Sequence, residues 1–553
     1  MIRSLKSVVL ICFLLSGVSS LIYEVVWIRL FVLVFGTTTF AVSTVLVAFM
    51  AGLALGSWWL GRFADRFSRP VFLYGLLEVG IGLYALFIPA MTGGLIPLSQ
   101  WLWRQWQPSF YAFSLIRFLL AFAILLLPTM LMGGTLPILS KFYAERKEQV
   151  GFSIGLLYGL NTLGAVIGAV AAGFVLLPEV GMRSTTQAAV TINLLVGFFA
   201  IAAGRTERAR VTVAEAQPVA TAKVVSTFAS SNPHALPRSV LLAVLIAFAL
   251  SGFVAMIYEV AWTRLLALIL GSSTYAFTIM LATFLVGLAL GSSLMARWVD
   301  RLRHPLLVLA RVEIGVGLAA LVGEHFFHQL PEWFLWLFGR FAESPHLLLA
   351  SQFLLAFLVM FLPTLLLGAV FPLVVRIYAG DLARVGRRVG TAYAMNTLGT
   401  ILGAFSAGFI LLPALGIQRS VTLGLVMNLL VGLALVLVGN PQEKLLFRFI
   451  TAVGVVLLIP LAIYAAPTWD PLVMSSGVYK DAPLYLRLYR SPKDVFSRIK
   501  SQYQPLFYKE GVTATVTVVE RPSLEDLHHL TLSIDGKVDA STAADMPTQI
   551  LSA

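Results

Sequence analysis

The chain has 553 residues, of which 59% are hydrophobic and 12% charged, and its formal net charge is +13. So apolar a composition excludes a soluble protein of this length and predicts an integral membrane protein in contact with the lipid bilayer. The single cysteine, Cys12, excludes a disulfide or a metal–thiolate site within one chain. We expect no metal, no cofactor and no catalytic residue.

Apolar runs long enough to cross a membrane follow one another along the chain. A helix rises 1.5 Å per residue, so about 20 residues cross about 30 Å of hydrocarbon. Six runs come first, at residues 8–34, 40–61, 71–90, 112–139, 152–177 and 186–204. Six more lie at residues 240–270, 275–296, 306–323, 348–375, 388–412 and 420–439. A thirteenth run, 449–466, follows, so we predict an all-α polytopic protein.

The second set of six spans is a copy of the first. Tyr23-Glu24-Val25-Val26-Trp27-Ile28-Arg29-Leu30 returns as Tyr258-Glu259-Val260-Ala261-Trp262-Thr263-Arg264-Leu265, an offset of 235 (258 minus 23). A solenoid repeat has only about 20–50 residues, so each copy is a domain-sized half. We expect these domains: repeats at 1–204 and 239–440, a cytoplasmic linker at 205–238, a thirteenth helix at 441–466 and a soluble segment at 467–553. Because each half has an even number of spans, the two halves share one orientation, as parallel repeats do.

The distribution of Lys and Arg among the loops predicts the orientation. The loops on the side of the N-terminus contain twenty-two of these residues, whereas those on the other side contain only Arg104, Arg183, Arg340 and Arg419. Cytoplasmic loops are enriched in Lys and Arg, so we expect a cytoplasmic N-terminus. The charge of +13 is mostly this bias, so it implies attraction to anionic lipid and no nucleic-acid partner. If residues 449–466 cross the membrane, the soluble segment lies outside the cytoplasm; if they lie in the interface, it is cytoplasmic.

Two acidic residues inside predicted spans are the main candidates for a functional site. Glu24 and Glu259 each cost about 3 kcal/mol to insert, so they are expected to face protein or water. Arg29 and Arg264 follow five residues later, about 140° around the helix, and do not pair with them along one face. One interpretation is a pair of buried cross-repeat ion pairs, Glu24 with Arg264 and Glu259 with Arg29. The other is an acidic site for a cationic substrate or for protons.

Three further polar residues lie within spans. Asn161 and Asn396 are repeat counterparts, and we expect interhelical hydrogen bonds from them, with substrate contact as the alternative. Arg117 has no basic counterpart, because Gln352 takes its place in the second half, and it is a minor candidate for an anion contact. Glycines at spacings of four predict close helix packing: Gly52/Gly56, Gly164/Gly168, Gly287/Gly291 and Gly399/Gly403.

The loop between the second and third spans resembles a known family. Its sequence, Gly61-Arg62-Phe63-Ala64-Asp65-Arg66-Phe67-Ser68-Arg69, resembles the signature Gly-x-Leu-Ala-Asp-Arg-x-Gly-Arg of the major facilitator superfamily, from which it departs at Phe63 and Ser68. The second copy, with Asp300 and Arg301, is weaker. The resemblance implies a six-plus-six bundle. Asp65, Arg66 and Arg69, with Asp300 and Arg301, are predicted to form a clasp that holds one cytoplasmic state; the alternative is cationic retention with an incidental acid.

The soluble segment after the last span resembles a different family. A β-branched run at 512–519 and a second at 530–534 predict an antiparallel pair of strands. Tyr508-Lys-Glu-Gly511-Val-Thr-Ala-Thr515, Ile534-Asp535-Gly536-Lys537-Val538-Asp539-Ala-Ser541-Thr542 and Asp545-Met-Pro-Thr-Gln549 resemble the region of spermidine synthases that leads into their active site. With the repeated Tyr-Glu-x-x-Trp-x-Arg motif, the chain is similar to bacterial proteins that join a facilitator-like membrane domain to a spermidine synthase-like domain. This resemblance implies a location in the bacterial inner (cytoplasmic) membrane.

This second resemblance implies polyamine chemistry without a complete enzyme. In synthases these strands lead into a nucleotide-binding domain with a Gly-rich loop, and no such loop follows here. Asp535, Gly536, Asp539 and Gln549 therefore correspond to the border of an active site. We expect a carrier or membrane anchor linked to small polyamine-type cations. One alternative is an aminopropyltransferase completed by a separate nucleotide-fold subunit; the other is a non-transporting scaffold in a larger membrane complex.

Overall fold

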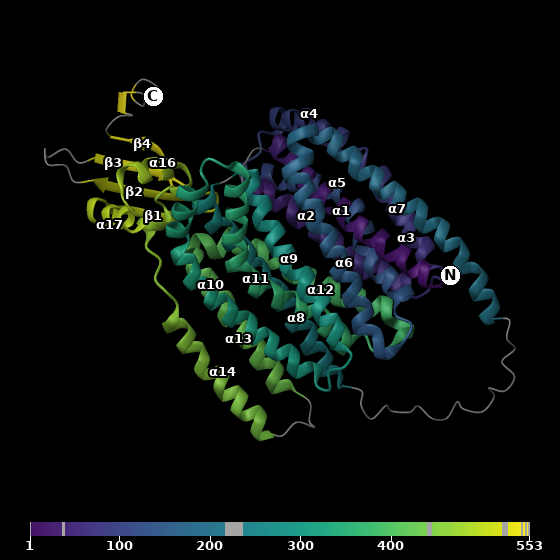
Figure 1. The fold of residues 1–553 in the computed structure, drawn as a ribbon. Coiled ribbons are helices and arrows are strands. Elements are labelled where there is room, and N and C mark those ends of the chain that lie inside the picture. Colours follow the sequence, from purple (N-terminus) through teal and green to yellow (C-terminus); the bar gives the residue numbers. More distant parts are fainter. Residues whose placement is uncertain are drawn as a thin grey trace.

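The computed structural model describes residues 2–35, 39–215, 236–271, 273–439, 445–521, 529–542, 546–547 and 550. It is a helical membrane bundle followed by a small sheet, which confirms the predicted fold class (Figure 1). Within the described residues, ten helices are long and apolar enough to span a membrane, or eleven if one bent pair is a single span. Two of these, at 150–205 and 382–438, are of double length and broken at a glycine, so each supplies two spans and thirteen result.

The two halves use the same series of helices. The first half comprises α1 (Ile2–Phe35), α2 (Thr39–Ala64), α3 (Pro70–Ala85), α4 (Ile88–Trp106), α5 (Phe110–Tyr143), α6 (Val150–Val170) and α7 (Leu177–Glu215). The second comprises α8 (Arg238–Leu270), α9 (Thr274–Val299), α10 (Pro305–Phe341), α11 (Pro345–Tyr378), α12 (Val385–Ser406) and α13 (Leu412–Val438), and α14 (Leu445–Ala465) follows. Of the predicted linker, residues 216–235 lie outside the described residues.

Two helices extend beyond their predicted spans. The third span continues through a 42° bend from α3 into α4, and the unbroken α10 reaches Phe341, whereas the prediction ended at residue 323. Both extensions are rich in Trp and carry Arg and Gln or Glu side chains, so hydropathy falls along them although the backbone stays helical. Hydropathy measures burial in lipid, and for this reason it underestimated both helices.

Each half contains the same glycine break. Short π-helical segments, η2 (Ala171–Leu176) and η4 (Ala407–Leu411), lead to Gly181 and Gly416. These glycines have φ values of 73° and 83°, a left-handed conformation that a Cβ atom disfavours. The chain therefore turns back at these points to begin the sixth span of each half.

The predicted glycine packing is confirmed in both halves. A Cβ atom added at Gly56 would overlap the backbone carbonyl of Met130 on α5, and one added at Gly291 would overlap that of Leu365 on α11. The equivalent contacts of α6 and α12 are Gly164 with Leu14 and Gly399 with Ala249. Between the halves, α2 packs against α12 and α6 packs against α9.

The soluble segment, here called the tail (residues 467–542), contains three short helices and four strands. The helices are α15 (Pro471–Met474), α16 (Val478–Leu488) and α17 (Pro492–Gln502). The strands β1 (Gln504–Glu510), β2 (Thr515–Arg521), β3 (His529–Ile534) and β4 (Lys537–Ser541) form an antiparallel sheet in the order β1-β2-β3-β4. The predicted antiparallel pair is confirmed as β2 and β3, and β1 and β4 were not predicted.

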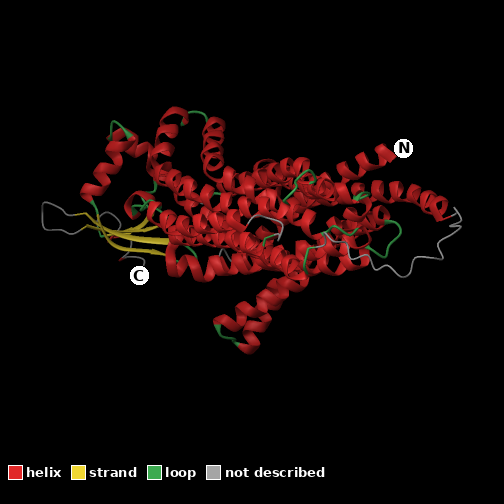
Figure 2. Ribbon diagram, turned by 90° about the horizontal axis from the view of Figure 1, so that it is seen from below, coloured by secondary structure: helices red, strands yellow, loops and turns green. Residues whose placement is uncertain are grey.

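The tail lies at the end of the bundle opposite the N-terminus (Figure 1). Seen from below in Figure 2, the strands form a layer beyond the helix ends. The tail contacts α8, α10 and α13, all from the second half. The Asp65 and Asp300 loops belong to the other end, where Lys6 near the N-terminus forms an ion pair with Glu145 at 2.9 Å.

Candidate functional site

A cavity of about 250 Å³ lies between the two halves. Eight helices line it: α1, α2, α5 and α6 from the first half and their repeat counterparts α8, α9, α11 and α12 from the second. Most positions in its wall occur in pairs separated by 235 residues, so the duplication has shaped one common cavity from equivalent surfaces.

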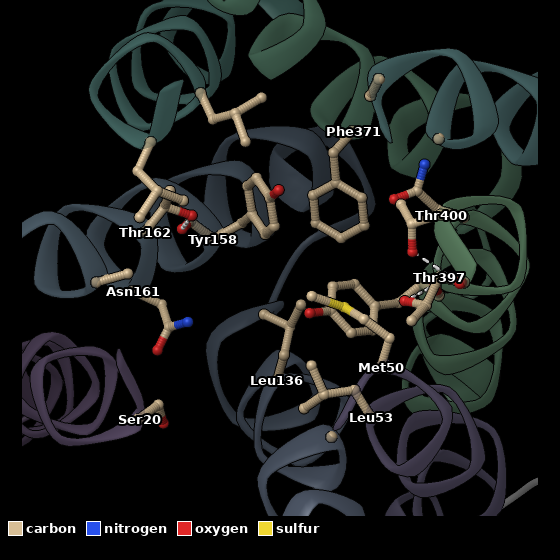
Figure 3. Close-up of a pocket in the computed structure, with 18 of the residues that line it drawn as sticks. Ser20, Met50, Leu53, Leu136, Tyr158, Asn161, Thr162, Phe371, Thr397 and Thr400 are labelled. Atoms are coloured by element: carbon tan, nitrogen blue, oxygen red, sulfur yellow. Dashed lines mark hydrogen bonds between the residues drawn. The ribbon is translucent and has the colours of Figure 1, made fainter. Parts of the chain in front are cut away.

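The polar lining follows the repeat. Figure 3 shows Ser20, Tyr158, Asn161, Thr162, Thr397 and Thr400 directed into this space. The paired polar positions are Ser16 and Ser251, Tyr158 and Tyr393, Asn161 and Asn396, Thr162 and Thr397, and Glu24 and Glu259. Three pairs depart from the pattern: Ser20 corresponds to Ala255, Thr135 to Val370, and Thr400 to Ala165. Hydroxyl, amide and carboxyl groups can therefore contact a solute in this cavity from both halves.

Glu24 and Glu259 are brought together in this cavity. They lie close enough for the charge of Glu259 to act on Glu24. The described lining residues include no Lys, Arg or His, so the cavity wall presents acidic groups alone. Like charges in a low-dielectric site repel strongly, and a bound cation or a proton relieves that repulsion.

The predicted cross-repeat ion pairs do not occur between the described side chains. Arg264 instead donates hydrogen bonds to the carbonyl oxygens of Val512 and, at 2.5 Å, Thr513 in the tail. Neither Arg264 nor Arg29 lines the cavity. The tail carbonyls lie nearly 250 residues from Arg264 in sequence, so inspection of the repeat alone could not identify them as its partners.

Aromatic rings form one side of the cavity. The rings of Tyr158 and Phe371 have centroids 4.6 Å apart, and Phe371 and Tyr393 follow at 6.2 Å (Figure 3). The faces of such rings attract cations. The cavity therefore combines carboxylates with ring faces, two features that favour an organic ammonium group.

Of the other three polar residues predicted within spans, two line the cavity and one does not. Asn396 lines the cavity and donates to the carbonyl oxygen of Phe248 at 3.0 Å, the interhelical bond that was expected. Asn161 also lines the cavity (Figure 3). Arg117 does not; its guanidinium lies 4.1 Å from the ring centroid of Phe113.

The predicted gating loops join the two halves at the end where the N-terminus lies. The Asp65 carboxylate accepts hydrogen bonds from the backbone N–H groups of Gly386 and Arg387, both at 2.9 Å. Its counterpart Asp300 accepts from Gly151 at 3.1 Å and from Phe152 at 2.7 Å. Each carboxylate thus caps the start of a helix in the opposite half, where the helix dipole favours a negative charge. We call these two contacts the clasp.

The cations of the clasp differ from those predicted. Lys141 donates to the carbonyl oxygens of Asp65 and Phe67 at 2.8 and 2.7 Å, and Arg376 pairs with Asp300 at 3.5 Å. Arg66 and Arg301 are exposed, and Arg69 precedes the first residue of α3. Burial raises the pKa of Asp65 and of Asp300 above the usual range, and the backbone N–H donors oppose that rise.

A second pair of repeat-related acids was not among the candidate site residues. Glu78 and Glu313 are both fully buried between helices. Glu78 accepts from Ser16 at 2.6 Å and from Asn193 at 2.7 Å, and Glu313 accepts from Asn428 at 2.8 Å. Asn193 and Asn428 are themselves repeat counterparts, and this coincidence in both halves was the available signal.

The residues of the synthase-like region support the hairpin of β3 and β4. Asp535 accepts from the Thr515 backbone N–H at 2.8 Å, and Asp535 and Gly536 form the turn with φ values of 49° and 77°. Asp539 pairs with Lys537 at 3.1 Å. Gln549 lies outside the described residues. Asp-Gly is the preferred residue pair for such a two-residue turn. The formation of this turn is therefore sufficient to explain why Asp535 and Gly536 occur in the synthase-like region.

Two six-span halves around a central polar cavity define a membrane protein of the transporter class. The sequence profile of the Major Facilitator Superfamily matches residues 8–339, more than half of the chain, and the chain belongs to that family. A comparison with curated proteins found no match.

Solved structures of similar fold are transporters. A bacterial homologue of the iron transporter ferroportin, outward-facing with soaked iron, is 15% identical with a TM-score of 0.50, over 78% of this chain and 98% of that one. The human organic anion transporter MFSD10 (TETRAN) is 15% identical with a TM-score of 0.48, over 78% and 99%. The E. coli fucose:proton symporter FucP is 15% identical with a TM-score of 0.47, over 79% and 99%. None of these supports the resemblance of the tail to a synthase.

Proposed function

We propose that this protein is a carrier for small organic cations. The observation on which the proposal depends is that Glu24 and Glu259, one from each half, line the same cavity, whose described wall contains no basic residue. A cation bound between them would contact both halves at once. It would therefore couple its own binding to the relative movement of the halves, as alternating access requires.

The wall of the cavity favours an organic cation. Tyr158, Phe371 and Tyr393 present ring faces next to the carboxylates, and cation–π contacts contribute about 0.5–2 kcal/mol each. The resemblance of the tail to spermidine synthases points to the same chemistry, so putrescine and spermidine are the substrates that we propose first.

The clasp indicates on which side of the membrane the bundle is closed. Asp65 and Asp300 close the end of the bundle that carries the N-terminus. If the excess of Lys and Arg places that end in the cytoplasm of a bacterium, the structure corresponds to a state closed on the cytoplasmic side. The tail then lies outside the cytoplasm.

An anchor function is the second candidate, and the position of the tail favours it. The tail is held on the second half by Arg264 and Glu510, and its edge strand β4 is largely exposed. A separate subunit could bind at that edge. Affinity purification from native membranes tests this candidate. A stoichiometric soluble partner that is lost when residues 529–542 are deleted supports it, and purification of the chain alone contradicts it.

Uptake into proteoliposomes tests the carrier function. The full chain is reconstituted, and uptake of radiolabelled putrescine and spermidine is compared for wild type, Glu24→Gln, Glu259→Gln and, as control, the exposed Glu179→Gln. We expect uptake to fall by at least about tenfold in each cavity variant, because each loses one charge partner, and to persist in the control. Absence of uptake by the folded wild type would contradict the proposal.

A further inference from the structure

We propose that Glu78 is a proton-binding site connected to the cavity through Ser16 and Ser20, so that the first half carries the coupling proton. This inference rests on the proposed carrier function, because it names the ion coupled to transport. It begins from Glu78, a fully buried carboxyl group in the wall behind the cavity.

The bonds of Glu78 connect it directly to the cavity. Ser16 lines the cavity and donates its hydroxyl to Glu78 at 2.6 Å. Asn193 on α7 donates to the second carboxyl oxygen at 2.7 Å. The titratable groups that face Glu78 are Cys12 and Tyr23 on α1 and Tyr74 on its own helix α3. Among the described residues, no group on α4 or α5, which also pack on α3, acts on Glu78.

None of these neighbours is a cation. A buried carboxylate without a cationic partner is costly, whereas the protonated acid is neutral and can donate a hydrogen bond. Glu78 can therefore take up a proton if one can reach it from the cavity.

A row of polar side chains provides that route. Ser16, Ser20 and Glu24 all line the cavity and follow one another at spacings of four along α1, on one face of the helix. Successive groups are separated by a rise of about 6 Å, which a bridging water can span, and the cavity of about 250 Å³ has room for several waters. The O–H bond of protonated Glu24 breaks and an O–H bond forms on the Glu78 carboxylate, which leaves Glu24 anionic.

The second half lacks this row. Ala255 occupies the position of Ser20, so the row at spacings of four from Ser251 to Glu259 lacks its middle hydroxyl on this face of α8. The surrounding network differs as well. Tyr258 donates to Asn428 at 2.9 Å beside Glu313, whereas the Tyr23 hydroxyl and the Asn193 carbonyl oxygen have no partner among the described residues. In addition, Leu309 takes the position of Tyr74. The row of polar groups from the cavity carboxyl to a buried carboxyl is thus complete only in the first half.

Infrared spectroscopy of the full chain in lipid nanodiscs tests this route. After a rapid change of pH, the carboxyl band of Glu78, assigned by its loss in Glu78→Gln, reports the rate of proton exchange. If Glu78→Gln fails to fold, Ser16→Ala assigns the band instead, because removal of the hydrogen bond shifts its frequency. We expect Ser20→Ala to slow exchange by at least about tenfold. The control variant Ser184→Ala, which removes an exposed hydroxyl outside the cavity wall, should leave the exchange rate of Glu78 within about twofold of wild type.

Equal exchange rates in wild type and Ser20→Ala, or the absence of an exchanging Glu78 band, would overturn the inference. Binding of radiolabelled putrescine to the same samples separates this failure from failure of the carrier proposal. Binding that depends on Glu24 together with unaltered exchange in Ser20→Ala refutes only the proton route. Slowed exchange without any putrescine binding refutes only the cation substrate.

Discussion

The carboxylate of Asp65 accepts a hydrogen bond at 2.9 Å from the backbone N–H of Gly386, 321 residues later and in the opposite half. The repeat generates the same bond in the reverse direction, from Gly151 to Asp300 at 3.1 Å. The two halves therefore hold each other at one end through carboxylates at helix starts. Because these bonds are local and few, they can break when the halves move.

Removal of the Asp65 carboxylate should open this end of the bundle. Asp65→Ala loses two charge-assisted hydrogen bonds, which we expect to cost the closed state about 3 kcal/mol or more. Ser57 is buried between α2 and α12, close to Gly390, so a Ser57→Cys reporter in a Cys12→Ser background is protected while the clasp is closed. We expect Asp65→Ala to accelerate labelling of this cysteine. Arg66→Ala, which removes an exposed neighbour, should not; equal acceleration in both variants would exclude a specific clasp.

The clasp should weaken as the pH rises. Burial raises the pKa of Asp65 and Asp300 in the closed state above their ordinary value of 3.8, which they regain when exposed. The closed state then binds protons more tightly than the open state, so it loses relative stability as pH rises from that ordinary value through the raised pKa. Energy transfer between dyes on Ser68→Cys and Ala383→Cys reports the distance between the halves. We expect it to fall over this window, and Asp65→Asn with Asp300→Asn to abolish the change. A pH response that persists in the double variant would assign it to other groups.

Close helix packing at Gly56 predicts opposite effects of two alanine substitutions. Gly56→Ala forces a methyl group against the Met130 carbonyl, and such overpacking costs about 1–3 kcal/mol. At Gly93 an added Cβ meets nothing within 4 Å, and the better helix propensity of alanine should stabilise by about 0.5–1 kcal/mol. Thermal unfolding in detergent should therefore give a lower Tm for Gly56→Ala and an unchanged or higher Tm for Gly93→Ala. If Gly56→Ala had the same Tm as wild type, the close approach of Gly56 to the Met130 carbonyl would not limit the size of the side chain at this position.

Glu510 should hold the tail on the membrane domain. Its carboxylate accepts from the backbone N–H of Ile417, immediately after the break at Gly416, and so caps the helix segment that begins there. Glu510→Ala loses this cap, at a cost of about 1–2 kcal/mol. Limited proteolysis of the connection at residues 466–470 should accelerate in this variant. Lys509→Ala provides the control, because Lys509 is exposed. If Glu510→Ala resisted cleavage as wild type does, contacts other than that of Glu510 would be sufficient to hold the tail on the membrane domain.

The residues that could be predicted are those whose environment is the membrane itself. Apolar length and the repeat were sufficient for the spans, and a carboxyl group inside a span is costly enough to identify Glu24 and Glu259 as candidates. The repeat also predicted two halves of the same orientation, with Glu24 and Glu259 at equivalent positions. Their meeting in one cavity follows from the parallel arrangement of the halves.

The residues that could not be predicted have partners that are distant in sequence. One interpretation paired Arg264 with Glu24, yet Arg264 bonds carbonyl oxygens of the tail, a segment outside the repeat. Glu78 and Glu313 were not selected as candidates because hydropathy does not distinguish the end of a span from its buried interior. The strands β1 and β4 were missed because β1 lacks an alternating pattern and β4 has only five residues.

The central claim is that Glu24 and Glu259 hold one cation together. Equilibrium binding of radiolabelled putrescine to the purified full chain, measured for wild type, both Gln variants and the double variant, tests it most directly. If one ligand bridges both carboxylates, each single variant should lose about tenfold or more in affinity, and the double variant should lose much less than the product of the two losses. Losses that multiply, or affinities unchanged in both single variants, would contradict a shared cation site.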